Sequence, residues 1–428
     1  MLDIEKLLNT YSESGNSIET FKKENSEIAE NTKELYVRSG DVIFLSLCEI
    51  PKYQVEGKVS FYVLSDEYIT DVLMNGSRFC VGTLDENEIG EELLEELKNT
   101  TGLMAIINGV KYVVSDLAIP TLTIRAGVGG DETIARQNLF RNLHFADAMI
   151  HRNAPIHFVY REGINLEGKE VRKILACFGS AYTYVPQTIM YDAVEEIVKD
   201  NILGDVPMRH WTISHEFTDI ELEFPEMKEE FSKEYGINLM PGIFMCTSDI
   251  GKSSNIIRGI FYIGCSYVII DEVLIKHVGK ISKKDILERV HDEIFPKIRT
   301  YPEVFAKLIG EYAVNYEKID LATESGCEKN LKMISELNAK VMRSCFKGVI
   351  PLKKIKQLVE CMNDEINSSI KYTLYDIALN FLSIPERVEG FDRLTLNEIK
   401  KAAAKVPAFL GKNLHENKKD DEIFLLPL

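Results

Sequence analysis

Between Tyr182 and Lys280 the chain reads Y-T-Y-V-P (182–186) and later T-S-D-I-G-K-S-S (247–254), a polar turn enclosed by apolar residues. Runs that are rich in β-branched and aromatic residues and end at Gly, Asn or Ser are typical of neighbouring strands. We therefore expect a sheet that displays polar and aromatic groups on one side, which is the layout of a binding surface. The strand-like runs beside the turn are 242–247, 255–263 and 267–276.

Strand and helix patterns alternate on the N-terminal side of these runs. The segment 104–114 has Asn108-Gly109 at its centre and predicts a hairpin, because both turn residues tolerate positive φ. A second hairpin is expected from 209–214 against 218–224. A helix with acidic residues in its first turn is expected over 131–150.

From residue 281 onward the pattern becomes helical. We expect an α+β protein whose central mixed or antiparallel sheet is packed by helices. Its parts would be a small acidic α/β N-terminal domain (1–100), a central sheet-bearing domain (101–280) and a helical C-terminal region with a charged tail (281–428). The expected C-terminal helices are 282–295, 301–316, 327–346, 352–367, 372–382 and 396–404.

Composition indicates an ordinary globular protein, with 45% hydrophobic and 27% charged residues and a net charge of -17. Residues 1–105 hold 9 Lys and Arg against 21 Asp and Glu, so the first part of the chain carries most of this charge. The eight cysteines form no C-x-x-C pair, which is typical of reduced thiols. The N-terminus lacks a signal-peptide pattern, and no apolar run approaches the roughly 20 residues of a membrane span. We expect a cytoplasmic protein without a membrane partner.

Several apparent motifs do not meet the requirements of their chemistry. Gly251-Lys252-Ser253 resembles the end of a phosphate-binding loop, but Cys246 stands where that loop needs its first glycine. His144, His151 and His157 have no cysteine at a standard metal-binding spacing. The sequence predicts no metal, no cofactor and no defined catalytic residue.

Three segments together resemble a known family: S-A-Y-T-Y-V-P-Q-T-I-M-Y-D-A-V (180–194), P-G-I-F-M-C-T-S-D-I-G-K-S-S-N-I-I-R-G-I-F-Y-I-G-C (241–265) and K-H-V-G-K (276–280). Their order is similar to that in the plasmid- and prophage-borne family catalogued as domain of unknown function 932, over roughly 170–280 of this chain. Ala181 stands where that family usually has arginine, and Ser266-Tyr267 replaces its Asn-Gly. The resemblance implies a phage or plasmid protein and no assigned activity.

The order of Tyr182-x-Tyr184, a helix and a hairpin is also similar to the core of phage single-strand annealing proteins. In their groove, Lys and Arg neutralise phosphates while aromatic rings stack on bases. The analogy implies a non-catalytic, oligomeric protein that binds single-stranded nucleic acid. The alternative is that the tyrosines are core or sheet residues and the cations are solvated. The candidate contacts are Lys169, Arg172, Lys173, Tyr182, Tyr184, Lys252, Arg258 and Lys280.

Two other functions stay open. A structural protein of a virion or another homo-oligomeric shell would suit an acidic chain with a polar N-terminal helix and an apolar C-terminal tip. An enzyme would draw on Ser248, Asp249 and His277, of which the last ends an apolar strand where a side chain can reach a ligand. The turn itself is explained if Asp249 accepts from backbone N–H groups ahead of Gly251. The polar-turn residues are Ser248, Asp249, Gly251, Ser253 and Ser254.

Overall fold

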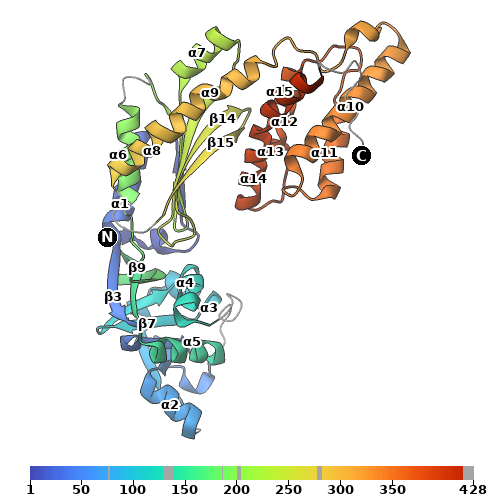
Figure 1. Ribbon diagram of the computed structural model, residues 1–428. Helices are drawn as coiled ribbons and strands as arrows, with labels where there is room; N and C mark the ends of the chain where they lie inside the picture. The colour runs from blue at the N-terminus through green and yellow to red at the C-terminus, as the bar shows by residue number, and fades with distance from the viewer. Residues whose placement is uncertain (76–77, 129–138, 186, 200–203, 277–281, 418–428) are drawn as a thin grey trace.

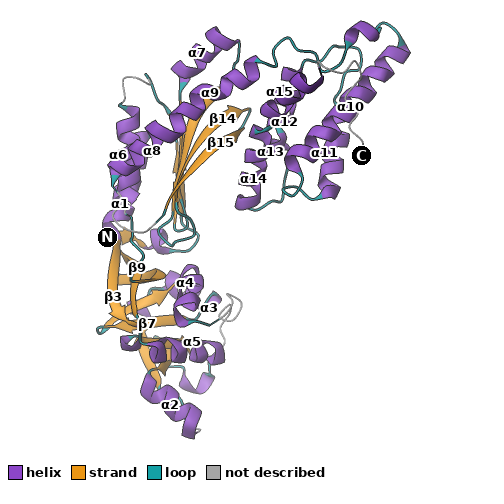
Figure 2. Cartoon of the chain, in the orientation of Figure 1, coloured by secondary structure: helices purple, strands orange, loops and turns teal. Residues whose placement is uncertain are grey.

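The computed structural model describes residues 1–75, 78–128, 139–185, 187–199, 204–276 and 282–417, and its fold is α+β with two sheets (Figures 1 and 2). The first sheet is mixed and has nine strands in the order β1-β9-β10-β8-β7-β4-β5-β6, with β3 paired to β9 beside this path. Its strands are β1 (Leu2–Asp3), β3 (Thr32–Arg38), β4 (Ile43–Leu47), β5 (Lys58–Leu64), β6 (Val81–Asp85), β7 (Leu103–Ile107), β8 (Val110–Val114), β9 (Pro155–Ile164) and β10 (Glu170–Gly179).

Helices pack on this sheet because the strands alternate apolar residues toward them. Phe44, Phe145 and Phe158 are fully buried in the core between the sheet and its helices. The expected helix over 131–150 begins at Leu139 in the described residues, since 129–138 lie outside them. The helices are α2 (Asp66–Asn75), α3 (Glu91–Asn99), α4 (Ile119–Ala126) and α5 (Leu139–Arg152).

The predicted hairpin over 104–114 is confirmed as β7 and β8, with Asn108 at φ 51° and Gly109 at φ 78° in its turn. This hairpin lies inside the first sheet, where β7 pairs with β4 and β8 pairs with β10. The sheet therefore continues across the boundary that we expected near residue 100, and it extends to Gly179. Pairing between distant strands, which has no local sequence signal, is the physical reason for this difference.

The second sheet is antiparallel, as predicted for the runs around the polar turn. Its order is β15-β14-β13-β12-β11-β2, and the expected hairpin around 215–217 is confirmed, while a second pair of strands meets across the polar turn 248–254. Its strands are β2 (Ser12–Gly15), β11 (Met208–Ser214), β12 (Thr218–Glu223), β13 (Met240–Thr247), β14 (Asn255–Ile263) and β15 (Ser266–Ile275).

One face of the second sheet is covered by helices, which Figure 1 shows lying along β14 and β15. Ile243, Ile257 and Phe261 point into this interface and are fully buried. The predicted helix over 301–316 is wrong beyond Ala306, where the chain leaves the sheet in a turn. The covering helices are α1 (Ile18–Asn31), α6 (Gln187–Val198), α7 (Pro225–Tyr235), α8 (Lys283–Arg289) and α9 (Phe295–Ala306), with a π-helical turn at Val290–Ile294.

The C-terminal region is helical, as expected, and lies at the far end of an elongated molecule from the first sheet (Figure 1). One of its helices, α14, returns to pack on β15 of the second sheet. Among the described helices, none combines the length and apolar character that a membrane crossing requires. The helices are α10 (Glu324–Phe346), α11 (Leu352–Asp364), α12 (Leu374–Leu382), α13 (Ile384–Arg387), α14 (Arg393–Ala404) and α15 (Val406–Asn417).

Candidate functional site

The polar turn between β13 and β14 lies against the first sheet. Ile250 is 1% exposed and packs with Val159 of β9 and Phe178 of β10. Gly251 has φ 72°, and a Cβ at this position would lie 2.7 Å from the Phe178 ring. Only glycine combines this backbone conformation with such a close approach. The turn is therefore a contact between the two sheets.

Asp249 in this turn is held by a buried arginine. Arg161 of β9 donates from Nη2 to Asp249 Oδ2 at 2.9 Å, and both side chains are fully buried. The same guanidinium lies 2.6 Å from His215 Nδ1 through Nη1, and its Nε donates to Thr32 Oγ1 at 3.2 Å. We call Thr32, Arg161, His215 and Asp249 the junction cluster, because its members come from both sheets.

Two expectations about the turn are corrected by this geometry. Asp249 pairs with Arg161, whereas the backbone N–H of Lys252 donates to Ser248 Oγ at 3.1 Å, so the serine hydroxyl closes the turn. Ser248 and Asp249 are 1% and 2% exposed, which removes both from contact with a substrate in solution. His277, the third member of the enzyme hypothesis, lies outside the described residues.

His215 is neutral in the folded protein. Its Nε2–H donates to the carbonyl oxygen of Leu8 at 2.7 Å, so Nδ1 accepts from Arg161. Burial lowers the pKa of His215 well below its ordinary value, and the nearby positive charges of Arg161 and Lys173 lower it further. The histidine therefore acts as a neutral hydrogen-bonding link at physiological pH.

The free energy of unfolding is expected to fall as the pH drops below 6.5, the ordinary histidine pKa. The unfolded chain takes up a proton at His215 in this range while the folded chain does not, so acid favours unfolding by up to roughly 1.4 kcal/mol per pH unit. His157, whose pKa is also lowered by burial, adds to this trend. Urea denaturation at several pH values should show a shallower acid slope for His215→Gln, whereas His210→Gln, at an exposed position, keeps the original slope. Equal slopes in all three proteins would contradict this account.

Tyr182 and Tyr184 are half-buried beside the junction cluster. Residues 182–185 form no strand, so the predicted strand is wrong there: β10 ends at Gly179, and the chain turns before Tyr182. The Tyr182 ring stacks on Phe178 with centroids 3.7 Å apart at an angle of 6°. Burial raises the pKa of both phenols, and the hydroxyl oxygens of both are shielded from solvent. One face of the Tyr182 ring is thus covered by Phe178.

Lys173 and Arg172 on β10 are engaged by groups of the chain itself. Lys173 is fully buried and donates to the carbonyl oxygen of Leu7 at 2.7 Å and to the Glu96 carboxylate. Burial lowers its pKa, which the Glu96 charge opposes. Arg172 pairs with Glu162 at 3.0 Å. These two cations are neutralised within the first sheet.

Arg258 and Lys252 are likewise paired with carboxylates. Arg258 is 4% exposed and donates from Nε to Glu272 at 2.6 Å, and Lys252 pairs with Glu216. Lys169 is exposed at the turn before β10, on the first sheet. Lys280 lies outside the described residues.

Those predicted nucleic-acid contacts that lie in the described part of the chain are thus not brought together into one cationic trough. The tyrosines are half-buried, and Lys173 of the first sheet and Arg258 of the second each have a carboxylate beside them. A phosphate backbone needs exposed cations whose charge is not already compensated. Of the predicted residues that the structure describes, Lys169 best meets that condition.

The second face of the second sheet carries aromatic residues that we did not single out from the sequence. Phe244, Tyr262 and Tyr267 lie on the face opposite the helices α8 and α9, and α14 packs over part of it. Lys400 of α14 places Nζ 3.4 Å from the Tyr267 ring centroid, and Arg393 pairs with Asp219 at 2.6 Å. Period-two alternation could have placed Phe244 and Tyr262 on one face, but nothing local indicates that α14 lies beside them.

Lys400 and Glu221, in the layer between α14 and the second sheet, have shifted pKa values. Burial lowers the pKa of Lys400 to about 8, although the Glu221 charge opposes this. Burial also raises the pKa of Glu221, which accepts from the Tyr262 hydroxyl at 3.1 Å. Such shifts accompany functional sites and also structural ion networks. In this layer, cations of α14 pair with carboxylates of the second sheet, so the layer joins α14 to the sheet.

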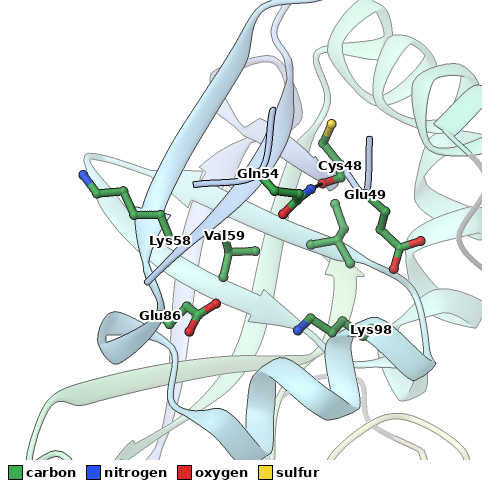
Figure 3. Close-up of a pocket in the computed structure, with 8 residues that line it drawn as sticks. Cys48, Glu49, Gln54, Lys58, Val59, Glu86 and Lys98 are labelled. Atoms are coloured by element: carbon green, nitrogen blue, oxygen red, sulfur yellow. Dashed lines mark hydrogen bonds between the residues drawn. The ribbon is translucent and has the colours of Figure 1, made fainter. Parts of the chain in front are cut away.

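A cavity of about 300 Å³ opens beside β4 and β5 of the first sheet. Figure 3 shows Lys98 and Glu86 on one side of it and Gln54 on another, where the Gln54 amide donates to the Cys48 carbonyl oxygen at 2.6 Å. Lysine and glutamate side chains both border the space, so neither charge dominates. The lining residues are Leu47, Cys48, Glu49, Gln54, Lys58, Val59, Glu86 and Lys98.

Within the described residues, no three His, Cys, Asp or Glu side chains come together as metal ligands. The chain matches no protein-family model, and no curated protein and no solved structure matches it significantly. The resemblance to the plasmid- and prophage-borne family stays a prediction.

Proposed function

We propose that this protein is a non-catalytic structural subunit of a homo-oligomeric assembly. The observation that carries the proposal is the junction cluster, in which Arg161 of the first sheet holds Asp249 and His215 of the second through buried hydrogen bonds. An assembly of identical copies closes correctly only if the contact surfaces on each copy keep a fixed relative orientation. A buried junction with hydrogen bonds and an ion pair between the two sheets supplies that rigidity.

The elongated shape supports the same proposal. The first sheet, the second sheet and the C-terminal helices follow one another along the molecule, so the two ends offer well-separated surfaces (Figure 1). The layer under α14 joins the third part to the second through the ion pairs Arg393–Asp219 and Lys401–Glu272. A virion or other mobile-element assembly, as the family resemblance implies, is the setting that we propose.

Nucleic-acid annealing is the weaker alternative. Its predicted tyrosines are half-buried with hydroxyl groups shielded from solvent, and Arg172, Lys173 and Arg258 are paired with carboxylates. Counterion release, the main source of affinity for nucleic acid, requires cations that are free to bind phosphate. A net charge of -17 adds a general repulsion toward polyanions.

Size-exclusion chromatography with light scattering tests the proposal. We expect the mass at low salt to be a multiple of the 48.7 kDa chain and to rise with protein concentration. The mass should not depend on added single-stranded oligonucleotide. A mass of one chain at every concentration would overturn the proposal, and assembly that appears only with oligonucleotide would favour annealing.

A further inference from the structure

Two segments of the chain carry charges of one sign only. Residues 79–97 hold seven acidic residues and no Lys or Arg, and residues 337–359 hold six basic residues and no Asp or Glu. We call them the acidic block and the basic block. The acidic residues are Asp85, Glu86, Glu88, Glu91, Glu92, Glu95 and Glu96, and the basic residues are Lys340, Arg343, Lys347, Lys353, Lys354 and Lys356.

The acidic block presents part of its charge to solvent. Leu93 and Leu97 of α3 are fully buried against the first sheet, so the helix turns Glu91 and Glu95 outward, where both are exposed. Some carboxylates of the block are used internally, as in the pair of Glu96 with Lys173. Within the described residues, Glu91 and Glu95 form no ion pair, so their charge is available to a partner.

The basic block covers the end of α10, the turn after it and the start of α11. Buried apolar residues of both helices hold this end together, while Arg343, Lys347, Lys353 and Lys356 are exposed. In the part of the chain that the structure describes, these four side chains form no ion pair. The first turn of α11 has no acidic residue to offset its lysines or the positive end of its dipole. These four exposed cations are therefore available to a partner.

The two blocks cannot pair within one molecule. The acidic block lies on the first sheet, and the basic block lies in the C-terminal helices at the far end (Figure 1). α3 packs mainly on β8, whereas α10 and α11 pack on each other and α10 also packs on α14 and α15. Opposite charges on separate ends of one molecule are matched when a second copy supplies the missing end.

We infer that the acidic block of one copy docks on the basic block of the next, in a head-to-tail contact. The inference rests on the proposed assembly and names the surface that forms it. A contact between two different surfaces repeats from copy to copy and yields a ring or a filament. The same chain carries both charges, and its net charge of -17 repels polyanions, so a second copy fits the basic block better than nucleic acid does. Because exposed charges are screened beyond about 10 Å at 0.1 M salt, added salt should weaken the contact.

Charge exchange tests the contact. One variant carries Lys353→Glu with Lys356→Glu, and the other carries Glu91→Lys with Glu95→Lys, all at exposed helix positions. Each variant alone places like charges across the contact, so assembly should require at least about tenfold more protein than in the wild type. An equal mixture of the two variants restores opposite charges at every contact and should recover the wild-type mass by light scattering.

The matched control is Lys233→Glu with Lys307→Glu, which changes the net charge equally at exposed positions outside the basic block and should assemble normally. If the wild type and each charge variant alone assemble at the same protein concentration, the inference is overturned and the proposed assembly stands. A mixture that stays as single chains would also overturn it. Wild-type protein that never assembles would overturn both. Loss of oligonucleotide binding in Lys353→Glu with Lys356→Glu, at unchanged mass, would assign the basic block to nucleic acid instead.

Discussion

Replacing Arg161 with methionine is expected to lower the free energy of unfolding by about 3–5 kcal/mol, the usual cost of removing one partner of a buried ion pair. The loss would leave the Asp249 carboxylate fully buried without its guanidinium partner, and His215 Nδ1 without its donor. Because the Arg161–Asp249 pair joins the two sheets, the contact between the sheets should open before either sheet unfolds. Urea denaturation measures the free energy, and hydrogen exchange at β9 and the 248–254 turn locates the loss.

A second substitution separates the ion pair from simple packing. Arg161→Met combined with Asp249→Leu removes both charges, so the double variant should recover a large part of the loss. Arg172→Met is the matched control, because this arginine is partly exposed on the neighbouring strand β10 and should change stability by less than about 1 kcal/mol. If the double variant were no more stable than Arg161→Met alone, the junction cluster would not act through charge.

Lys173→Met is expected to destabilise the protein by about 2–4 kcal/mol. This side chain is fully buried, and its ammonium group serves the Leu7 carbonyl oxygen and the Glu96 carboxylate, both of which would lose their donor. Thermal and urea denaturation measure the effect. Lys169→Met, at an exposed position close by on the same hairpin, should leave stability within about 0.5 kcal/mol.

This pair of variants also distinguishes a structural lysine from a phosphate contact. If Lys173 bound nucleic acid, its replacement would weaken oligonucleotide binding and reduce its salt dependence, while stability stayed unchanged. Equal stability of Lys173→Met and Lys169→Met would therefore contradict the structural role that we assign to Lys173.

Elements with a strong local signal were predictable. The 104–114 hairpin follows from Asn108-Gly109, whose left-handed conformations two-residue turns require. The strands β13, β14 and β15 follow from their apolar, β-branched composition, and the C-terminal helices from their periodicity. Where the local signal is short, as at 182–185, the prediction failed, because two aromatic residues pack as well in a half-buried loop as in a strand.

The candidate site was less predictable, because its residues meet across large sequence distances. The polar turn was singled out correctly as an unusual segment, but its partner Arg161 lies 88 residues away and His215 lies 54 residues from that arginine. Neither partner stands in a motif. Lys173 and Arg258 read as available cations in the sequence, and only the folded chain places carboxylates beside them.

The sequence by itself determined the α+β class, the turns and most helices, and the two blocks of opposite charge, because each depends on residues close together along the chain. Only the tertiary structure decided that one sheet continues to Gly179, that Ser248, Asp249 and Ile250 of the polar turn are buried where the two sheets meet, and that the two charged blocks lie at opposite ends. The physical reason is that strand pairing, burial and charge compensation join residues that are distant in sequence. The free energies of these interactions depend on which distant groups come into contact. No local sequence pattern records those contacts.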